Sequence, residues 1–206
     1  MTIEEFIDLV KRKGSILVEG ADCAGKTTFI NNINKSLCYS VIHSTPVCSY
    51  QKTKLLESGA DLKNIFAYSM IVKQEICNQS NCNYIFDRGY LTELIYGKVY
   101  RDGTALQQNE IKFLADVPII VLCLPESEQE QMHQFTIQHS SRKELYEADK
   151  KMQEVMHKFW DIKNNPFVED YDIRKYSDVY VYDYTTKQVS LLYEKGQIRY
   201  AYKNKV

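Results

Sequence analysis

The chain contains 206 residues, of which 44% are hydrophobic and 26% are charged, and its formal net charge is −1. This length and composition fit one α/β domain with a sizeable core, and the near-zero charge argues against a nucleic-acid partner. No apolar run approaches the roughly 20 residues that cross a bilayer, and the acidic, amphipathic N-terminus does not resemble a secretory signal. We therefore expect a cytoplasmic protein without a membrane or nucleic-acid partner.

The first predicted elements are a helix and a short strand. Thr2 and Glu5 form a capping-box pattern at the start of an amphipathic segment, and Gly14 can end that helix. Residues 16–18 are then a short run of apolar, β-prone side chains, as in a buried strand.

The residues after this strand match a phosphate-binding loop, with the pattern Gly-x-x-x-x-Gly-Lys-Thr at residues 20–27. Phe29, Ile30 and Ile33 follow at helical spacing, so a helix begins where the loop ends. A glycine-rich turn can match this pattern by chance, but the strand before it and the helix after it favour a nucleotide site. The predicted nucleotide-binding residues are Gly20, Ala21, Asp22, Cys23, Ala24, Gly25, Lys26, Thr27 and Thr28.

The chemistry of this loop predicts ATP and Mg²⁺ as its ligands. Glycines let several backbone N–H groups converge on one anion, and the following helix points its positive end at the same place. Lys26 adds a charge for the β- and γ-phosphates, and Thr27 offers a hydroxyl ligand to Mg²⁺.

The rest of the chain alternates between predicted strands and helices. Residues 53–60 are polar and carry no predicted element, and a short helix is expected after the last strand. The strands are expected at residues 39–43, 84–86, 117–124 and 179–182, and the helices at residues 62–76, from 91 onward, 111–114, 126–135 and 144–162. This order predicts a three-layer α/β/α sandwich around a parallel sheet of about five strands, in a single domain.

A second group of functional residues follows the strand at 84–86. Asp87 can help to hold the Mg²⁺ shell, and Arg88 can clamp a second phosphate bidentately. A strand-end Asp-Arg pair is often only a solvated turn, but its position after a phosphate loop favours the functional interpretation.

These segments resemble the thymidylate kinase family. EGADCAGKTT at residues 19–28 resembles that family's loop, and DRGYLTELIYG at residues 87–97 resembles its Asp-Arg segment. In the second segment Asp87, Arg88 and Tyr96 match, and Thr92 stands for a serine. Looser similarity covers VPIIVLCLPESE, the lid arginine with the helix behind it, and VYVYDYTT, so that the resemblance spans roughly residues 14–195.

The resemblance implies a P-loop kinase fold and phosphoryl transfer from ATP·Mg²⁺ to a deoxynucleoside monophosphate, dTMP or a related pyrimidine nucleotide. It implies that Arg88 holds the acceptor phosphate, that Asp22 reaches the acceptor sugar, and that Arg142 closes from a lid loop at about 136–146. With Lys26, these are the predicted catalytic residues. Members of the family often form homodimers, which analogy extends to this chain.

The implied acceptor-binding residues are Arg88, Phe66, Tyr96, Thr92, Arg101 and His43. Phe66 can equally be a core aromatic, His43 can be structural, and Arg142 can be a solvated surface charge. These alternatives stay open at the level of sequence.

The chain also departs from the family pattern. Cys23 stands where some members carry an arginine, Met70 replaces an arginine that faces the nucleotide, and Gly97 replaces a glutamine. We interpret the chain as a divergent nucleotide kinase with altered base selection, and we suggest a phage type for it. Two rival interpretations are a kinase acting on the hydroxyl of a deoxynucleoside or modified base, and an ATP-binding module without catalysis.

Overall fold

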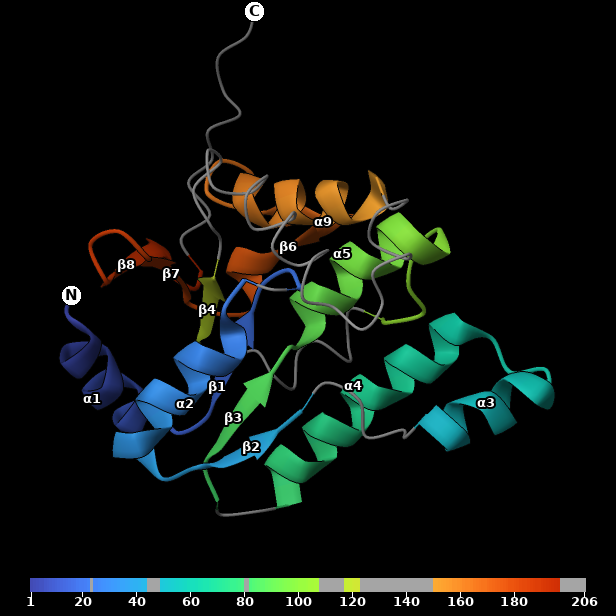
Figure 1. The fold of residues 1–206 in the computed structure, drawn as a ribbon, viewed down its shortest axis with the longest axis horizontal. Coiled ribbons are helices and arrows are strands. Elements are labelled where there is room, and N and C mark those ends of the chain that lie inside the picture. Colours follow the sequence, from blue (N-terminus) through green and yellow to red (C-terminus); the bar gives the residue numbers. More distant parts are fainter. Residues whose placement is uncertain (23, 44–48, 80–81, 108–116, 123–149, 197–206) are drawn as a thin grey trace, which may run out of the picture.

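The computed structural model describes residues 1–22, 24–43, 49–79, 82–107, 117–122 and 150–196 (Figure 1). Several predicted features lie outside these residues: Cys23, the helices at 111–114 and 126–135, the lid loop at 136–146 with Arg142, and the first part of the helix expected at 144–162. None of the described helices is long and apolar enough to cross a membrane.

The central layer is a six-stranded sheet with the strand order β2-β3-β1-β4-β7-β8 (Figure 1). The strands are β1 (Ile16–Glu19), β2 (Ser40–Ile42), β3 (Tyr84–Asp87), β4 (Ile119–Leu122), β7 (Val179–Asp183) and β8 (Gln188–Tyr193). All neighbouring strands from β2 to β7 pair in parallel, which confirms the predicted parallel sheet. The connection after β1 leads past β3 to β2, whereas the connection after β3 leads past β1 to β4, so the chain leaves these two neighbouring strands in opposite directions. Folds of this kind bind ligands at such a switch point, outside the carboxyl ends of the strands.

Two layers of helices cover the sheet, which confirms the three-layer prediction (Figure 1). Ile16 and Val18 pack with α1 (Ile3–Lys13) and α2 (Lys26–Leu37) on one face. Leu17, between them in β1, packs on the other face with α4 (Leu62–Gln79), α5 (Tyr90–Arg101) and α9 (Lys150–Asp161). This alternation follows from the period of two in a strand, and burial on both faces explains why β1 and β4 are apolar at successive positions.

The last strand is followed by β8 and not by the expected short helix. Asp183 Oδ1 accepts hydrogen bonds from the amides of Thr185 and Thr186 at 2.8 and 3.2 Å, so a tight turn reverses the chain. β8 then pairs antiparallel with β7, and Val189 in β8 exchanges backbone hydrogen bonds with Met1. The helix prediction was wrong because residues 188–193 pair along β7, and this tertiary pairing decides their conformation.

Short elements were also missed. α3 (Ser49–Glu57) occupies part of the polar segment that carried no prediction, and it packs against α4. Its Leu55 and Leu56 are both exposed, so α3 has no continuous apolar stripe from which a helix could be recognised. After α9, β5 (Phe167–Val168) and β6 (Tyr171–Asp172) form a small antiparallel hairpin, followed by the short 3₁₀ helix η2 (Ile173–Lys175).

The capping box predicted for α1 is present. The amide of Glu5 donates to Thr2 Oγ1 at 3.2 Å, and the amide of Thr2 donates to Glu5 Oε2 at 2.8 Å. Gly14 ends the helix with a φ of 92°. The sequence therefore determines both ends of this helix locally.

We expect Thr2→Ala to lower the free energy of unfolding by about 1 kcal/mol, because one amide of the first turn loses its acceptor. Chemical denaturation monitored by circular dichroism measures the change. Ser36→Ala, at an exposed position inside α2, is the matched control and should alter stability by no more than about 0.5 kcal/mol. Equal stability of Thr2→Ala and the wild type would show that the cap contributes nothing.

Candidate active site

The phosphate-binding loop runs from the carboxyl end of β1 into α2. Gly20 and Gly25 have φ values of 152° and 78°, and a Cβ at Gly20 would lie 2.6 Å from the Leu122 carbonyl oxygen. Gly25 is the N-cap residue of α2 and has no side chain to bond the amides of the first helical turn. Within the described residues no side chain caps those amides, which can therefore bond an external anion, as the motif predicts.

Lys26 is buried beneath the loop and turns back onto it. Its ammonium group donates to the carbonyl oxygens of Gly20, at 3.0 Å, and Ala21. Burial, together with the positive charge of Arg88, lowers the pKa of Lys26 to about 8. An anion bound in the loop would stabilise the charged form, since opposite charge counteracts desolvation.

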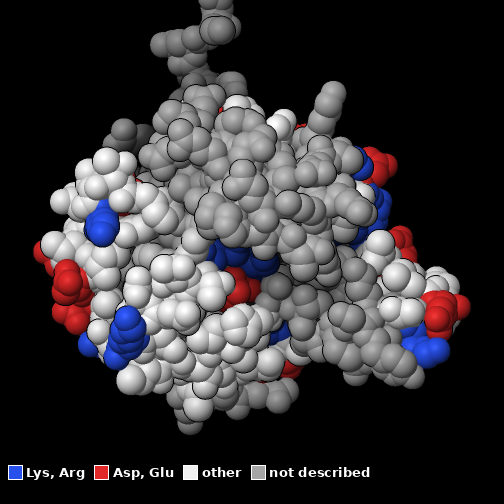
Figure 2. All heavy atoms as spheres, viewed as in Figure 1, with Lys and Arg blue, Asp and Glu red and all other residues white. Residues whose placement is uncertain are grey.

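Arg88 reaches the same loop from the end of β3. Its guanidinium donates from Nη1 to the Gly20 carbonyl at 3.2 Å and from Nη2 to Asp22, and its side chain is 17% exposed. Lys26 and Arg88 thus share one carbonyl oxygen as acceptor. Figure 2 shows basic and acidic atoms next to each other in a hollow near the middle of the face it presents. The structure therefore brings together three predicted catalytic residues, Lys26, Arg88 and Asp22.

Tyr96 joins this group from α5. Its hydroxyl accepts a hydrogen bond from the amide of Asp22 at 3.1 Å, and the guanidinium carbon of Arg88 lies 5.3 Å from the centre of its ring. The ring and the hydroxyl of one side chain therefore contact both the arginine and the phosphate loop.

Thr92 lies near this group, but its hydroxyl is bonded to Glu19. The fully buried carboxylate of Glu19 accepts from this hydroxyl and from the amides of Leu91 and Thr92 at 3.1 and 3.2 Å. Burial raises the pKa of Glu19, while the bond from the Thr92 side chain, a bond from the Gly89 backbone and the charges of Lys73 and Arg88 oppose the rise. Glu19 therefore acts as an N-terminal cap for α5, supplied from β1. In this structure Thr92 serves that cap, and its role toward an acceptor stays a prediction.

Asp87 and His43 meet at the ends of β3 and β2. His43 Nδ1 lies 3.1 Å from Asp87 Oδ2, and His43 is largely exposed. The other carboxylate oxygen of Asp87, Oδ1, is buried and has no hydrogen-bond partner among the described residues.

An orphaned, buried carboxylate oxygen beside the phosphate loop fits a role in the shell of a Mg²⁺ ion. Thr27, in the first turn of α2, is exposed and would supply the hydroxyl ligand. Within the described part of the chain no three His, Cys, Asp or Glu side chains are grouped to hold a metal. Mg²⁺ needs no such cage, because in nucleotide sites it keeps waters and takes phosphate oxygens as ligands.

Phe66 and Arg101, both predicted to bind the acceptor, lie against each other. The guanidinium carbon of Arg101 is 4.3 Å from the centre of the Phe66 ring, and Arg101 Nη2 donates to Glu93 Oε2 at 2.7 Å. Thr104 donates to the other oxygen of Glu93 at 2.8 Å. The two predicted residues thus form one cluster between α4 and α5.

Besides the carboxylates Glu19 and Glu93, two of the described residues at the site were not predicted. Lys73 in α4 is only 1% exposed and donates to the Arg88 carbonyl at 2.7 Å, and burial lowers its pKa to about 8. The tyrosine hydroxyl of Tyr184, after β7, donates to the Ala24 carbonyl of the phosphate loop. Lys73 lies on the apolar face of α4, seven residues after Phe66. A charged residue at an apolar position of a helix was the sequence signal that could have identified it. Nothing local marks Tyr184, whose contact spans 160 positions of the chain.

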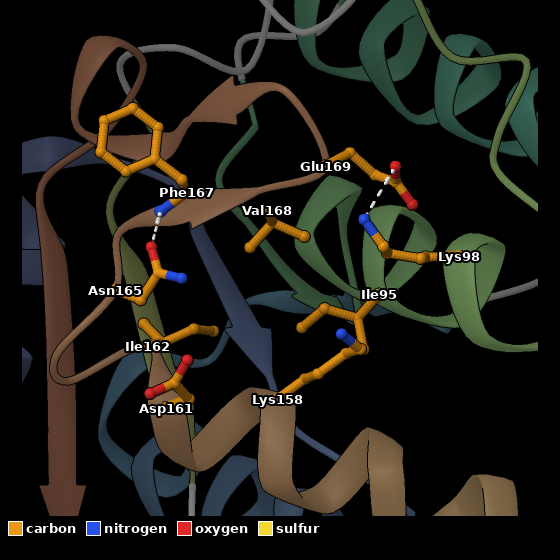
Figure 3. Close-up of a pocket in the computed structure, with 9 residues that line it drawn as sticks. All are labelled: Ile95, Lys98, Lys158, Asp161, Ile162, Asn165, Phe167, Val168 and Glu169. Atoms are coloured by element: carbon orange, nitrogen blue, oxygen red, sulfur yellow. Dashed lines mark hydrogen bonds and ion pairs between the residues drawn. The ribbon is translucent and has the colours of Figure 1, made fainter.

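A separate cavity of about 250 Å³ lies between α5, α9 and the β5–β6 hairpin (Figure 3). Ile95 and Val168 point into it, and its rim carries Lys98 and Glu169, whose charged groups lie 3.4 Å apart. None of the described residues of the predicted active site lines it. Charged residues of both signs and apolar residues line this cavity.

The family model described as an AAA domain matches residues 15–174, and the chain belongs to this family. A search of curated proteins finds no match. Among solved structures, the chain is similar to deoxyadenosine kinase from M. mycoides with bound dATP, at 19% identity and a TM-score of 0.52, over 84% of this chain and 94% of that one.

Two further structures show weaker similarity. One is the YorR protein from Bacillus subtilis in complex with phosphorylated GDP, at 18% identity and a TM-score of 0.48, over 82% of this chain and 84% of that one. The other is shikimate kinase from Acinetobacter baumannii in complex with shikimate, at 16% identity and a TM-score of 0.45, over 86% and 87%. The fold is a P-loop kinase fold, and the resemblance to thymidylate kinases in particular stays a prediction.

We expect Gly25→Ala to abolish nucleotide binding, because its Cβ would lie 2.9 Å from the Tyr184 hydroxyl and its φ of 78° disfavours any side chain. Calorimetric titration with ATP·Mg²⁺ measures the loss. Gly59→Ala is the matched control: its φ of 85° carries similar strain, but no atom lies within 4 Å of its Cβ. Both variants should lose about 1–2 kcal/mol of stability, and only Gly25→Ala should lose binding. Normal ATP affinity in Gly25→Ala would contradict the assigned loop geometry.

Proposed function

We propose that this chain is an ATP-dependent kinase that transfers the γ-phosphoryl group to a deoxynucleoside monophosphate, dTMP or a related pyrimidine nucleotide. The observation that carries the proposal is the approach of Arg88 to the phosphate loop: Lys26 and Arg88 donate to the same carbonyl oxygen, at 3.0 and 3.2 Å. An anion bound between two cations held this close would be stabilised by both, and phosphoryl transfer brings two phosphate groups to such a place.

In this proposal the residues act by positioning and by charge. The loop amides and Lys26 hold the β- and γ-phosphates of ATP, and Arg88 leaves Asp22 to take the acceptor phosphate in line with them. Asp22 would then bind the acceptor sugar, as the resemblance implies. Bound Mg²⁺, held by Thr27 and within reach of Asp87, would neutralise the charge that develops on the phosphate oxygens.

The acceptor side is proposed to extend toward Phe66 and Arg101. Their stacked pair lies between α4 and α5, and Tyr96 on α5 contacts Arg88. A base bound against Phe66 would therefore share α5 with the phosphate clamp. Arg142 is proposed to close over the transferring group, as the resemblance implies. The substrates of the proposed reaction are small nucleotides, which need no macromolecular partner.

A second candidate is a kinase that phosphorylates a hydroxyl group of a deoxynucleoside. The His43–Asp87 pair, at 3.1 Å, favours it, because a hydroxyl acceptor must lose a proton and an ionised phosphate need not. The structurally similar deoxyadenosine kinase makes this candidate worth testing, although the likeness shows the fold alone.

A substrate screen separates these possibilities. ADP release is followed with each natural deoxynucleoside monophosphate and each deoxynucleoside as acceptor, and turnover with a pyrimidine monophosphate is expected. Turnover with unphosphorylated acceptors alone would overturn the monophosphate proposal and support the second candidate. ATP binding without turnover for any acceptor would favour an ATP-binding module.

Lys26→Ala should lower kcat by at least about 100-fold, because the loop loses the cation that faces the transferring phosphate. Steady-state ADP release at saturating acceptor measures the effect. Lys35→Ala, at an exposed position in the same helix, is the control and should retain wild-type kcat. Unchanged turnover in Lys26→Ala would rule out phosphoryl transfer at this loop.

Arg88→Ala should lower kcat/KM for the acceptor by about 100-fold, with a raised acceptor KM, while the KM for ATP changes little. Initial rates over a grid of both substrates separate the two constants. Arg12→Ala removes an exposed arginine from α1 and should change neither of them. Normal acceptor kinetics in Arg88→Ala would show that the acceptor phosphate binds elsewhere.

A further inference from the structure

Lys73 occupies an unusual position for a lysine. Its side chain comes from α4, is 1% exposed, and ends on the backbone carbonyl of Arg88 at 2.7 Å. Burying an ammonium group is unfavourable unless it is paired, and such groups are seldom retained without a role. Glu19 and Asp87 are the carboxylates whose charges act on it.

The residue that Lys73 holds has a strained backbone. Arg88 has a φ of 72°, in the left-handed region that side chains other than glycine rarely adopt. Such a conformation is disfavoured by about 1–2 kcal/mol and persists only where its surroundings impose it. Here the amide of Arg88 donates to the Val18 carbonyl at 2.9 Å, and its carbonyl accepts from Lys73.

The residues after Arg88 are held from the opposite side. The carboxylate of Glu19 binds the amides of Leu91 and Thr92, at the start of α5. Gly89 lies so close to this carboxylate that a Cβ there would be 2.8 Å from Glu19 Oε1. The turn between β3 and α5 is therefore held by a buried cation at one end and a buried anion at the other.

We infer that Lys73 is a positioning residue for the acceptor clamp: it imposes the left-handed backbone of Arg88 and so points the guanidinium at Gly20 and Asp22. The inference rests on the proposed role of Arg88 in the proposed function. Lys73 follows Phe66 by two helical turns on the same face of α4. α4 thus carries both Phe66, which is proposed to contact the base, and Lys73, which bonds the turn that contains Arg88.

The first test uses Lys73→Met, which keeps most of the length of the side chain and removes the charge. Lys63→Met is a matched control, because Lys63 lies on the same helix and also donates to a backbone carbonyl at 2.7 Å, that of Asp102. Hydrogen exchange of residues 86–93, read by mass spectrometry, should become at least about tenfold faster in Lys73→Met and stay unchanged in Lys63→Met. Unchanged exchange in Lys73→Met would overturn the inference, whether or not the protein proves to be a kinase.

The second test asks whether Lys73 acts through Arg88. In the wild-type background, Lys73→Met should lower kcat/KM for the acceptor by about 10- to 100-fold and leave the KM for ATP within about twofold. In the Arg88→Ala background, the same substitution should have almost no further effect. Equal losses in both backgrounds would mean a general structural role and would contradict positioning.

Lys73→Gln gives a graded variant, since its amide can still donate to a carbonyl. Its kcat/KM for the acceptor should fall less than that of Lys73→Met. If Lys73→Met does not fold, Lys73→Gln replaces it in both the exchange and the kinetic test. Failure of the wild type to turn over any acceptor would overturn the proposed function alone, because the exchange measurement decides the role of Lys73 independently.

Discussion

Two positive side chains, Lys26 and Arg88, donate to one carbonyl oxygen, and the surrounding structure keeps them there. Like charges at this separation repel each other, and within the described residues Arg88 pairs with Asp22 while Lys26 donates to backbone carbonyls. The folded chain therefore holds a cationic centre that a phosphate group would relieve. The parallel sheet makes this possible, because β1 and β3 end side by side at the same edge, where Val18 pairs with Asp87.

Beneath this centre lies a buried group of charges. Glu19 and Lys73 are almost fully inaccessible, and each bonds the backbone of the turn between β3 and α5. Buried charges contribute little net stability, because their desolvation offsets their attraction. Their retention is better explained by geometry: they impose a strained backbone at Arg88, and strain of this kind gathers at functional sites. The buried charges and the strained backbone lower the stability of the fold somewhat, and they preorganise the site.

The parts of the fold predicted correctly depend on local signals. The capping box of α1 and the strand–loop–helix context of residues 16–33 are each encoded within a few neighbouring residues. The hairpin to β8 was missed because its turn depends on bonds that the amides of Thr185 and Thr186 donate to Asp183, which no apolar periodicity reveals. α3 was missed for a related reason, since its two leucines are exposed and leave no apolar stripe.

The candidate site shows the same division. The sequence by itself determined the phosphate loop, the Asp87-Arg88 segment and the layered α/β architecture, because each depends on the spacing and type of adjacent residues. Only the tertiary structure decided that Thr92 bonds Glu19, that Arg101 stacks on Phe66, and that Lys73 holds the Arg88 carbonyl. These contacts join elements that pack together from distant parts of the chain. Their geometry depends on burial and strand order, which local sequence spacing does not encode.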